Sequence, residues 1–317
     1  MCKELSLAET ATLLNSATNI VLVSHISPDG DTLGSALALA EGLKSLGKQV
    51  IVTVDDLIGS TYSFLPGIAD IVTPVEGQVL AADLLVAIDS SSIDRLGVLS
   101  QLVQAPILNI DHHISNTKFA DFLYLDATAS ATGEIIYSLL RQLQVDISLG
   151  MATNLYVAIV TDCGYFKYSN TTPKCMMTAA ELVELGVKPN EVSYNLEMKS
   201  RDNLLLLRQI LNTLAFAAEG KIASIEISLA NYNKDIDTDA FIQYPRYIEG
   251  VEVAFMFKAV EQNVTRVSMR SRTIDVSSIA LSFGGGGHKR AAGCTFHGDL
   301  TEAKTALIAA VQKEMDK

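Results

Sequence analysis

The sequence predicts an α/β protein with two domains, the first of them built on a mostly parallel sheet. Three observations lead to this fold class. Short apolar runs alternate with stretches of helical spacing through the first half of the chain, which is typical of a sheet covered by helices. In the last third, segments such as 221–228 alternate polar and apolar residues at period two. The chain has 317 residues, more than one small core usually contains.

Four apolar runs in the first half are the expected strands: 20–23, 50–54, 84–88 and 106–110. Each is nearly continuous in apolar character, as expected for strands with both faces buried. Between the first two, apolar residues from Leu33 to Leu43 recur at helical spacing. The run 155–160 is ambiguous, because a strand and the last turns of a helix from about Thr153 would both explain it.

The segments that follow define the domain boundary. Residues 173–185 are expected to form a helix ended by Gly186 and Pro189. We predict a first domain over residues 1–195, a helical linker over 196–218 and a smaller α/β domain over 219–317. Within the second domain, 251–258 and 263–270 are an expected strand pair, and a final helix is expected from about 301 to 313.

The stretch from His25 to Asp31 places one imidazole and two carboxylates directly after the first strand. Gly30 between the carboxylates permits a tight turn, and Gly34 would let the following helix pack close to the sheet. Asp29 and Asp31 could then point to one place. The alternative is an ordinary strand-to-helix loop in which Asp31 only caps the helix.

Further acidic and imidazole groups follow the other runs. Asp89 follows the third strand, Asp111 to His113 follow the fourth, and Asp162 follows the ambiguous run. Taken singly, each could be a capping turn or a surface loop. Because the carboxyl ends of strands in an α/β sheet form the binding crevice, we expect these groups to converge. Six of them supply the donors that two divalent cations need: His25, Asp29, Asp31, Asp89, His112 and Asp162.

The donor set consists of imidazoles and carboxylates without thiolates. Such a set suits Mn²⁺, and less well Mg²⁺ or Zn²⁺. Two closely spaced cations can activate a water molecule and neutralise an attacked phosphate group. These residues therefore favour metal-assisted hydrolysis of a phosphate ester.

A second cluster is basic. Six potentially cationic residues occur within 25 positions of an otherwise acidic sequence: Arg266, Arg270, Arg272, His288, Lys289 and Arg290. The glycine run Gly284–Gly287 lies directly before His288, and exposed amides in such a loop can bind phosphate oxygens. The alternative is a flexible turn flanked by solvated charges.

The formal net charge of −12 limits the partners. Gripping long duplex nucleic acid needs a broad basic face, whereas a short nucleotide needs only a local basic pocket. No apolar run reaches the roughly 18 residues that span a bilayer, and the N-terminus lacks the pattern of a signal peptide. The four cysteines are scattered without a CxxC pair, which favours reduced thiols and a cytoplasmic location.

Five motifs, in their order along the chain, resemble those of the DHH phosphoesterase superfamily. They are His25 to Asp31, Asp89-Ser90, Asp111-His112-His113, Thr161 to Phe166, and the segment from Arg270 through the glycine run to Gly293, which looks like a DHHA1 domain. The length and motif order are similar to the nanoRNase type. Cys163 departs from the pattern, because threonine is expected between Asp162 and Gly164.

The resemblance implies roles for these residues and a site in a cleft between the two domains. His25, Asp29, Asp31, Asp89, His112 and Asp162 would be the ligands of two Mn²⁺ ions, with Mg²⁺ or another divalent cation as the alternative. Asp111 would support His112, and His113 would lie near the phosphate. Substrate-holding residues from the second domain would be Arg270, Arg272, Gly285, Gly286, Gly287 and His288. A homodimer is compatible with the resemblance.

The implied activity is hydrolysis of very short oligoribonucleotides to mononucleotides, together with removal of the 3′-phosphate of 3′-phosphoadenosine 5′-phosphate (pAp). A sister group acts on cyclic di-AMP or its linear product pApA, and the same residues would serve that reaction. A nucleotide sensor without catalysis is a third hypothesis, although the complete set of ligand residues disfavours it.

Overall fold

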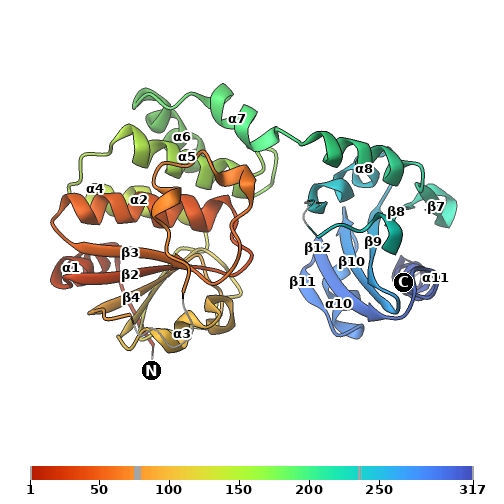
Figure 1. Cartoon of the computed structure of the whole chain (residues 1–317), viewed down its shortest axis with the longest axis horizontal. Coiled ribbons are helices and arrows are strands. Elements are labelled where there is room, and N and C mark those ends of the chain that lie inside the picture. Colours follow the sequence, from red (N-terminus) through yellow and green to blue (C-terminus); the bar gives the residue numbers. More distant parts are fainter. Residues whose placement is uncertain (1, 75–79, 235, 237, 316–317) are drawn as a thin grey trace. The chain divides into compact units, whose positions relative to one another are not determined.

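The computed structural model describes residues 2–74, 80–234, 236 and 238–315 (Figure 1). The chain divides into two compact units, Met1–Met198 and Lys199–Lys317. Each unit contains a six-stranded sheet with helices packed against it, which confirms the predicted α/β class. Within the described residues, every helix is too short or too polar to cross a bilayer.

The sheet of the first unit is parallel at every pairing of neighbouring strands. Its strands, in spatial order, are β1 (Lys3–Glu4), β6 (Phe122–Leu125), β5 (Ile107–Asp111), β4 (Leu84–Ile88), β2 (Asn19–Ser24) and β3 (Gln49–Val54). The four predicted strands are all present, and β1 and β6 are additions that the apolar pattern did not mark. The chain extends from β2 to β3 on one side and from β4 to β5 and β6 on the other. The order of the sheet therefore reverses between β2 and β4.

Helices cover both faces of this sheet because its strands bury side chains on both sides. The helices are α1 (Leu7–Ser16), α2 (Gly30–Ser45), α3 (Leu99–Leu102), α4 (Thr132–Gln142), α5 (Leu149–Asp162), α6 (Pro173–Glu184) and α7 (Pro189–Glu197), with 3-10 turns η1 (Ser60–Tyr62), η2 (Ile68–Asp70) and η3 (Ile93–Leu96). Helices α2, α4 and α5 lie over one face of the sheet and α3 lies over the other (Figure 1). Leu22 and Val86 belong to the larger core with residues of α1, α2, α4 and α5, whereas Val21 and Leu85 pack with residues of η3 and α3.

The ambiguous run 155–160 belongs to the helix α5. Ser148 caps this helix, since its side chain accepts a hydrogen bond from the amide of Met151. The helix is almost completely buried, so its apolar residues show no amphipathic period that would distinguish it from a strand.

The sheet of the second unit is antiparallel except for one pair. Its strands, in spatial order, are β11 (Gly286–His288), β12 (Ala291–His297), β10 (Val264–Ser271), β9 (Val253–Glu261), β8 (Ile222–Ile227) and β7 (Ala215–Ala217), with β8 and β9 parallel. The helices are α8 (Arg201–Leu211), α9 (Gln243–Arg246), α10 (Val276–Ser282) and α11 (Leu300–Met315), with 3-10 turns η4 (Ala218–Gly220), η5 (Leu229–Asn231) and η6 (Asp239–Ile242).

Two cores form on the two faces of this second sheet. On one face, Phe255 and Phe257 of β9 pack with residues of α10 and α11. On the other face, Met256 packs with Leu206 and Ile210 of α8. The helix α8 lies in the segment predicted as a linker, and its apolar stripe is buried in the core of the second unit.

Candidate metal centre

The predicted site residues lie at the carboxyl edge of the first sheet, where its strand order reverses. The loop after β2 carries His25 and Asp29, the first turn of α2 carries Asp31, and Asp89 directly follows the adjacent strand β4. The next strand, β5, ends in the Asp111–His113 segment. In an open parallel sheet, diverging loops leave a crevice at this point, which explains why residues far apart in sequence meet here.

Asp29 has two separate contacts. Its Oδ1 atom caps α2 by accepting from the amides of Asp31 and Thr32, at 3.0 and 3.1 Å. Its Oδ2 atom lies 3.6 Å from His25 Nε2. The helix therefore begins at Gly30, and Asp29 rather than Asp31 is the capping residue.

The two glycines of this motif have other roles than predicted. Gly30 lies inside α2 without a positive φ, and a Cβ there would lie 2.5 Å from Thr161 Oγ1 of α5. A Cβ on Gly34 would lie 2.2 Å from the carbonyl oxygen of Asn154. Both glycines therefore permit close contact between α2 and α5, and the expectations of a tight turn at Gly30 and of packing on the sheet at Gly34 are wrong.

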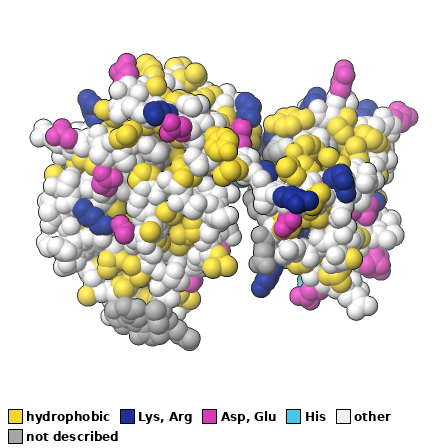
Figure 2. Space-filling view, turned by 45° about the horizontal axis from the view of Figure 1, so that its top comes forward, with side chains coloured by type: hydrophobic (Ala, Val, Ile, Leu, Met, Phe, Trp, Pro, Cys, Tyr) yellow, Lys and Arg dark blue, Asp and Glu magenta, His cyan; other side chains and the backbone are white. Residues whose placement is uncertain are grey.

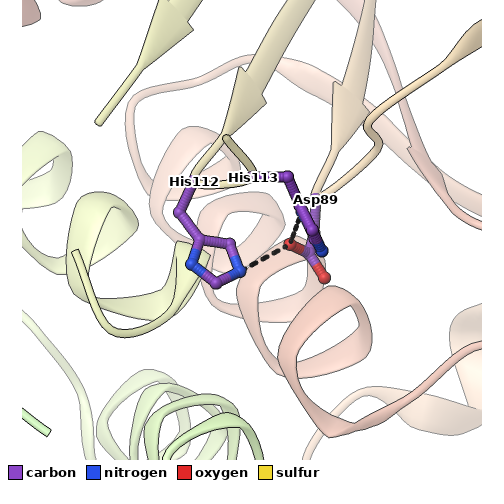
Figure 3. Close-up of side chains that lie close together, drawn as sticks. All are labelled: Asp89, His112 and His113. Atoms are coloured by element: carbon purple, nitrogen blue, oxygen red, sulfur yellow. Dashed lines mark ion pairs between the residues drawn. The ribbon is translucent and has the colours of Figure 1, made fainter. Parts of the chain in front are cut away.

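Asp89 is the central carboxylate of the cluster (Figure 3). Its Oδ2 atom lies 3.5 Å from His25 Nε2, and its Oδ1 atom lies 3.5 Å from both His112 Nε2 and His113 Nδ1. Thr132 of α4 donates a hydrogen bond of 2.9 Å to Oδ1. Asp89 adopts a φ of 56°, in the left-handed region that non-glycine residues rarely occupy. Such backbone strain is typical of functional sites.

Asp31 is held by backbone amides of α4. Its two oxygens accept hydrogen bonds from the amides of Thr132 and Gly133, at 2.7 and 2.9 Å. These amides belong to the first turn of α4, where free N–H groups favour a negative charge. The fixed carboxylate lies 3.8 Å from His112 Nε2, and Asp162 Oδ2 lies 3.7 Å from the same nitrogen.

His112 provides a direct test of whether a cation fits. Its Nδ1 atom lies 3.3 Å from the carbonyl oxygen of Ala129, so Nδ1 carries the proton and donates it. The Nε2 atom is buried and has no hydrogen-bond partner among the described residues, yet three carboxylates surround it at 3.5–3.8 Å. A lone pair facing carboxylate oxygens is unfavourable unless a cation lies between them, so these residues fit a metal ion.

The pKa values of the cluster also indicate that its residues fit a cation. Burial and the neighbouring carboxylates raise the pKa of Asp31 well above its usual value and raise the pKa of Asp162 to about 6. Burial lowers the pKa of His25, but the carboxylates of Asp29 and Asp89 outweigh this effect and raise it to about 9. Three overlapping groups could each hold a cation: His25–Asp29–Asp89, Asp31–His112–Asp162 and Asp89–His112–His113.

Asp111 and His113 form a pair beside these groups. Asp111 Oδ1 accepts a hydrogen bond of 2.7 Å from His113 Nδ1, and Asn116 donates to the other oxygen at 2.6 Å. Burial lowers the pKa of His113, yet Asp111 and Asp89 overcome this and raise it to about 9. The ring is thereby oriented with Nε2 as its remaining proton-bearing atom.

Several contacting residues were not found by the sequence reasoning. Thr132 and Gly133 hold Asp31 and Asp89, Asn170 donates to Asp162 Oδ2 at 3.3 Å, and an Arg95 nitrogen lies 2.7 Å from His25 Nδ1. His25 Nδ1 also lies 2.8 Å from the carbonyl oxygen of Ile26, so a protonated Nδ1 donates to Ile26, whereas an unprotonated Nδ1 accepts from Arg95. A threonine, an asparagine or a lone arginine has no distinctive spacing, so no local pattern marked these residues.

Cys163, the position that departs from the motif, is completely buried at the end of α5. Its Sγ atom accepts the amide of Phe166 at 3.3 Å. A hydrogen bond with Cys175, together with burial, raises the pKa of the Cys163 thiol. The side chain thus packs in the core beside Cys175 and helps to shape the loop after Asp162.

The predicted substrate residues lie in the second unit. Arg270 and His288 both pair with Ala291, one on β10 and the other on β11, so they flank β12 on one face. Arg272 is exposed just beyond β10. Part of the glycine run is used structurally, because the Gly285 amide donates to the Ala280 carbonyl at 2.8 Å and closes α10. Gly286 and Gly287 pair with β12.

Comparison with known proteins agrees with this arrangement. The pattern described as "DHH family, N-terminal domain" matches residues 19–159, and the DHHA1 domain matches residues 223–317. The chain belongs to the DHH/DHHA1 phosphoesterase family.

Individual relatives extend over nearly the whole chain. The bifunctional oligoribonuclease and PAP phosphatase NrnA of Thermus thermophilus is 35% identical, covering 94% of this chain and 90% of that protein. Among solved structures, an exopolyphosphatase-related protein from Bacteroides fragilis has a TM-score of 0.88 and 25% identity, covering 97% and 96% of the two chains. RecJ from Thermus thermophilus in complex with Mn²⁺ shares the fold, with a TM-score of 0.57 and 16% identity, covering 97% of this chain and 54% of that one.

Proposed function

We propose that this protein is a hydrolase that cleaves very short oligoribonucleotides to mononucleotides and removes the 3′-phosphate of pAp. The observation that carries the proposal is the convergence of carboxylates on the bare Nε2 atom of His112. The printed names of relatives that match over most of the chain support the substrate class.

In this proposal two divalent cations are held by His25, Asp29, Asp31, Asp89, His112 and Asp162. Asp89 is the residue shared between them, because one of its oxygens faces His25 and the other faces His112. The oxygen and imidazole donors favour Mn²⁺, with Mg²⁺ as the alternative. Bound cations supply Lewis-acid chemistry: they lower the pKa of a water molecule and neutralise charge on a phosphoryl group.

The chain's own residues bind and position the substrate. His113, oriented by Asp111, holds a proton at Nε2 that a phosphoryl oxygen can accept as a hydrogen bond. The Thr132 and Gly133 amides keep Asp31 in place without a movable side chain. In the second unit, Arg270, Arg272 and His288 bind phosphate oxygens, together with Gly285, Gly286 and Gly287.

The charge distribution supports short substrates. Residues 1–198 contain 9 Lys and Arg against 22 Asp and Glu, whereas residues 199–317 contain 15 against 14. On the face drawn in Figure 2, the basic side chains of the described residues stand singly or in small groups. A long duplex would require a broad basic surface, while a dinucleotide requires only a few cations.

A substrate panel tests the proposal. The purified protein with Mn²⁺ is given pApA, pAp and cyclic di-AMP, and initial rates are compared with those of the Asp89→Ala variant. Hydrolysis of pApA and pAp by the wild type, with loss of both in the variant, is expected. A clear preference for cyclic di-AMP would replace the proposed substrate class, and no turnover of any compound would refute the enzymatic function.

A further inference from the structure

The second unit contains a pocket of about 390 Å³. Two cations, Lys258 of β9 and Arg266 of β10, line it together with the hydroxyl-bearing Ser268 and Thr295. Its remaining lining residues include the carboxylate of Asp239 and the glycines Gly284, Gly285 and Gly293. The amides of Gly284 and Gly285 already donate to carbonyl oxygens of α10, so the two cations and the two hydroxyl groups are what suit the lining to an anion with several oxygen atoms.

The two cations face each other within the sheet. Arg266 pairs with Lys258 across β9 and β10, and with Thr295 across β10 and β12. Like charges directly opposite one another destabilise a sheet, so this pair has a cost that a bound anion would remove. Lys258 is only 16% exposed and lies 3.3 Å from Asp239 Oδ1. Arg266 is exposed and makes no ion pair within the described part of the chain, so the pocket keeps a net positive charge.

Gly284 and Gly285 form one wall of this pocket, and Gly285 has no room for a side chain. A Cβ added at Gly285 would lie 2.2 Å from the carbonyl oxygen of Gly293 and 2.5 Å from Cys294 Cβ. The run therefore lies directly against β12. A ligand can approach backbone rather than side chains on this side.

The pocket lies on the same face of β10 as the predicted phosphate-binding residue Arg270. Arg266, Ser268 and Arg270 alternate along β10, so their side chains share one face of the sheet. From Arg266 to Arg270 this row is roughly 13 Å long, at about 3.3 Å per residue. His288 lies at the Arg270 end, because both residues pair with Ala291. A single phosphate cannot contact both ends of such a row.

We propose that the pocket at Arg266 and Lys258 is a second phosphate subsite for a phosphodiester-linked chain. This proposal rests on the proposed function, in which Arg270 holds the phosphate that is cleaved. The subsite binds the backbone phosphate of a neighbouring nucleotide, so that an oligoribonucleotide lies along β10. The smaller pAp molecule engages the Arg270 end alone.

The test compares chain lengths. Arg266→Gln and Lys258→Gln are assayed on pAp and on 5′-phosphorylated RNA of two, three and four nucleotides, with Arg208→Gln as the matched control. Arg208 is an exposed arginine on α8 outside the pocket lining. For Arg266→Gln we expect kcat/KM to fall about 10-fold on the three- and four-nucleotide substrates and to stay within about twofold on pAp.

Binding provides a readout separate from catalysis. Fluorescence anisotropy of a labelled tetranucleotide is measured on His112→Ala protein with and without Arg266→Gln, and AMP is titrated as a competitor. If Arg266→Gln raises the Kd of the tetranucleotide about 10-fold, the subsite is supported even where the wild type hydrolyses nothing. Absence of hydrolysis alone would refute only the proposed function. Three outcomes would overturn the subsite. The first two are an equal loss of kcat/KM on pAp and tetranucleotide, or unchanged kcat/KM on both. The third is AMP binding that depends on Arg266 while the Kd of the tetranucleotide is unaltered.

Discussion

The two units place their polar groups in opposite ways. The first unit has a formal charge of −13 and buries the carboxylates of Asp31, Asp89 and Asp111. The second has a charge of +1 and carries Arg266, Arg270 and Arg272 on or just beyond strand β10. Buried carboxylates that repel one another need cations to stay ionised. Exposed arginines need no partner, and they bind an anion from solvent. In the proposed function, this difference in charge assigns cation binding to the first unit and phosphate binding to the second.

The largest expected effect follows from removing the bare imidazole nitrogen of the first unit. His112→Ala should lower kcat/KM on pAp by about 100-fold or more, because a lost ligand costs at least as much as a lost supporting contact. Rates and bound manganese are both measured. His297→Ala, an exposed histidine on β12, serves as the control. Full activity of His112→Ala would remove the two-cation proposal.

Packing in the first unit gives the next effect. In Gly34→Ala the new methyl group would meet the Asn154 carbonyl oxygen at 2.2 Å, so α2 and α5 must separate. We expect a loss of about 1–3 kcal/mol in the unfolding free energy of this unit, measured by calorimetry. Gly59→Ala, where nothing lies within 4 Å of the new atom, should be nearly neutral. Equal stability of both variants would contradict the close packing.

Metal binding should depend on pH because of the protonation of His25. The pKa of this group is raised to about 9, so at pH 7 it carries a proton that a bound cation must displace. Affinity for Mn²⁺ should therefore rise between about pH 6 and 9, by up to tenfold per pH unit for each proton released. Calorimetry in buffers of different ionisation enthalpy counts the protons. An affinity independent of pH over this range would show that His25 is neutral before binding.

The smallest effect is expected in the second unit. Arg272→Ala removes one exposed cation, whose contribution is screened by solvent. KM for pAp should rise about 5-fold while kcat changes by less than about twofold, which corresponds to roughly 1 kcal/mol of binding. Arg208→Ala on α8 is the matched control. An unchanged KM would remove Arg272 from the phosphate-binding group.

The sequence by itself determined the α/β class, four of the six strands of the first sheet and the motifs after them. Continuous apolar runs are a local property, and so is the position of an acidic residue directly after a run. For the same reason the sequence could predict His25, Asp89 and His112 as metal ligands before any contact between them was known.

Only the tertiary structure decided how these residues are held. Asp31 is fixed by the amides of Thr132 and Gly133, about a hundred positions away in the sequence. The run 155–160 is part of a helix that is buried on all sides, and this burial removes the amphipathic period that would have identified it. A hydrogen bond or a close helix contact depends on distance in space, and no local pattern encodes which distant backbone groups will meet.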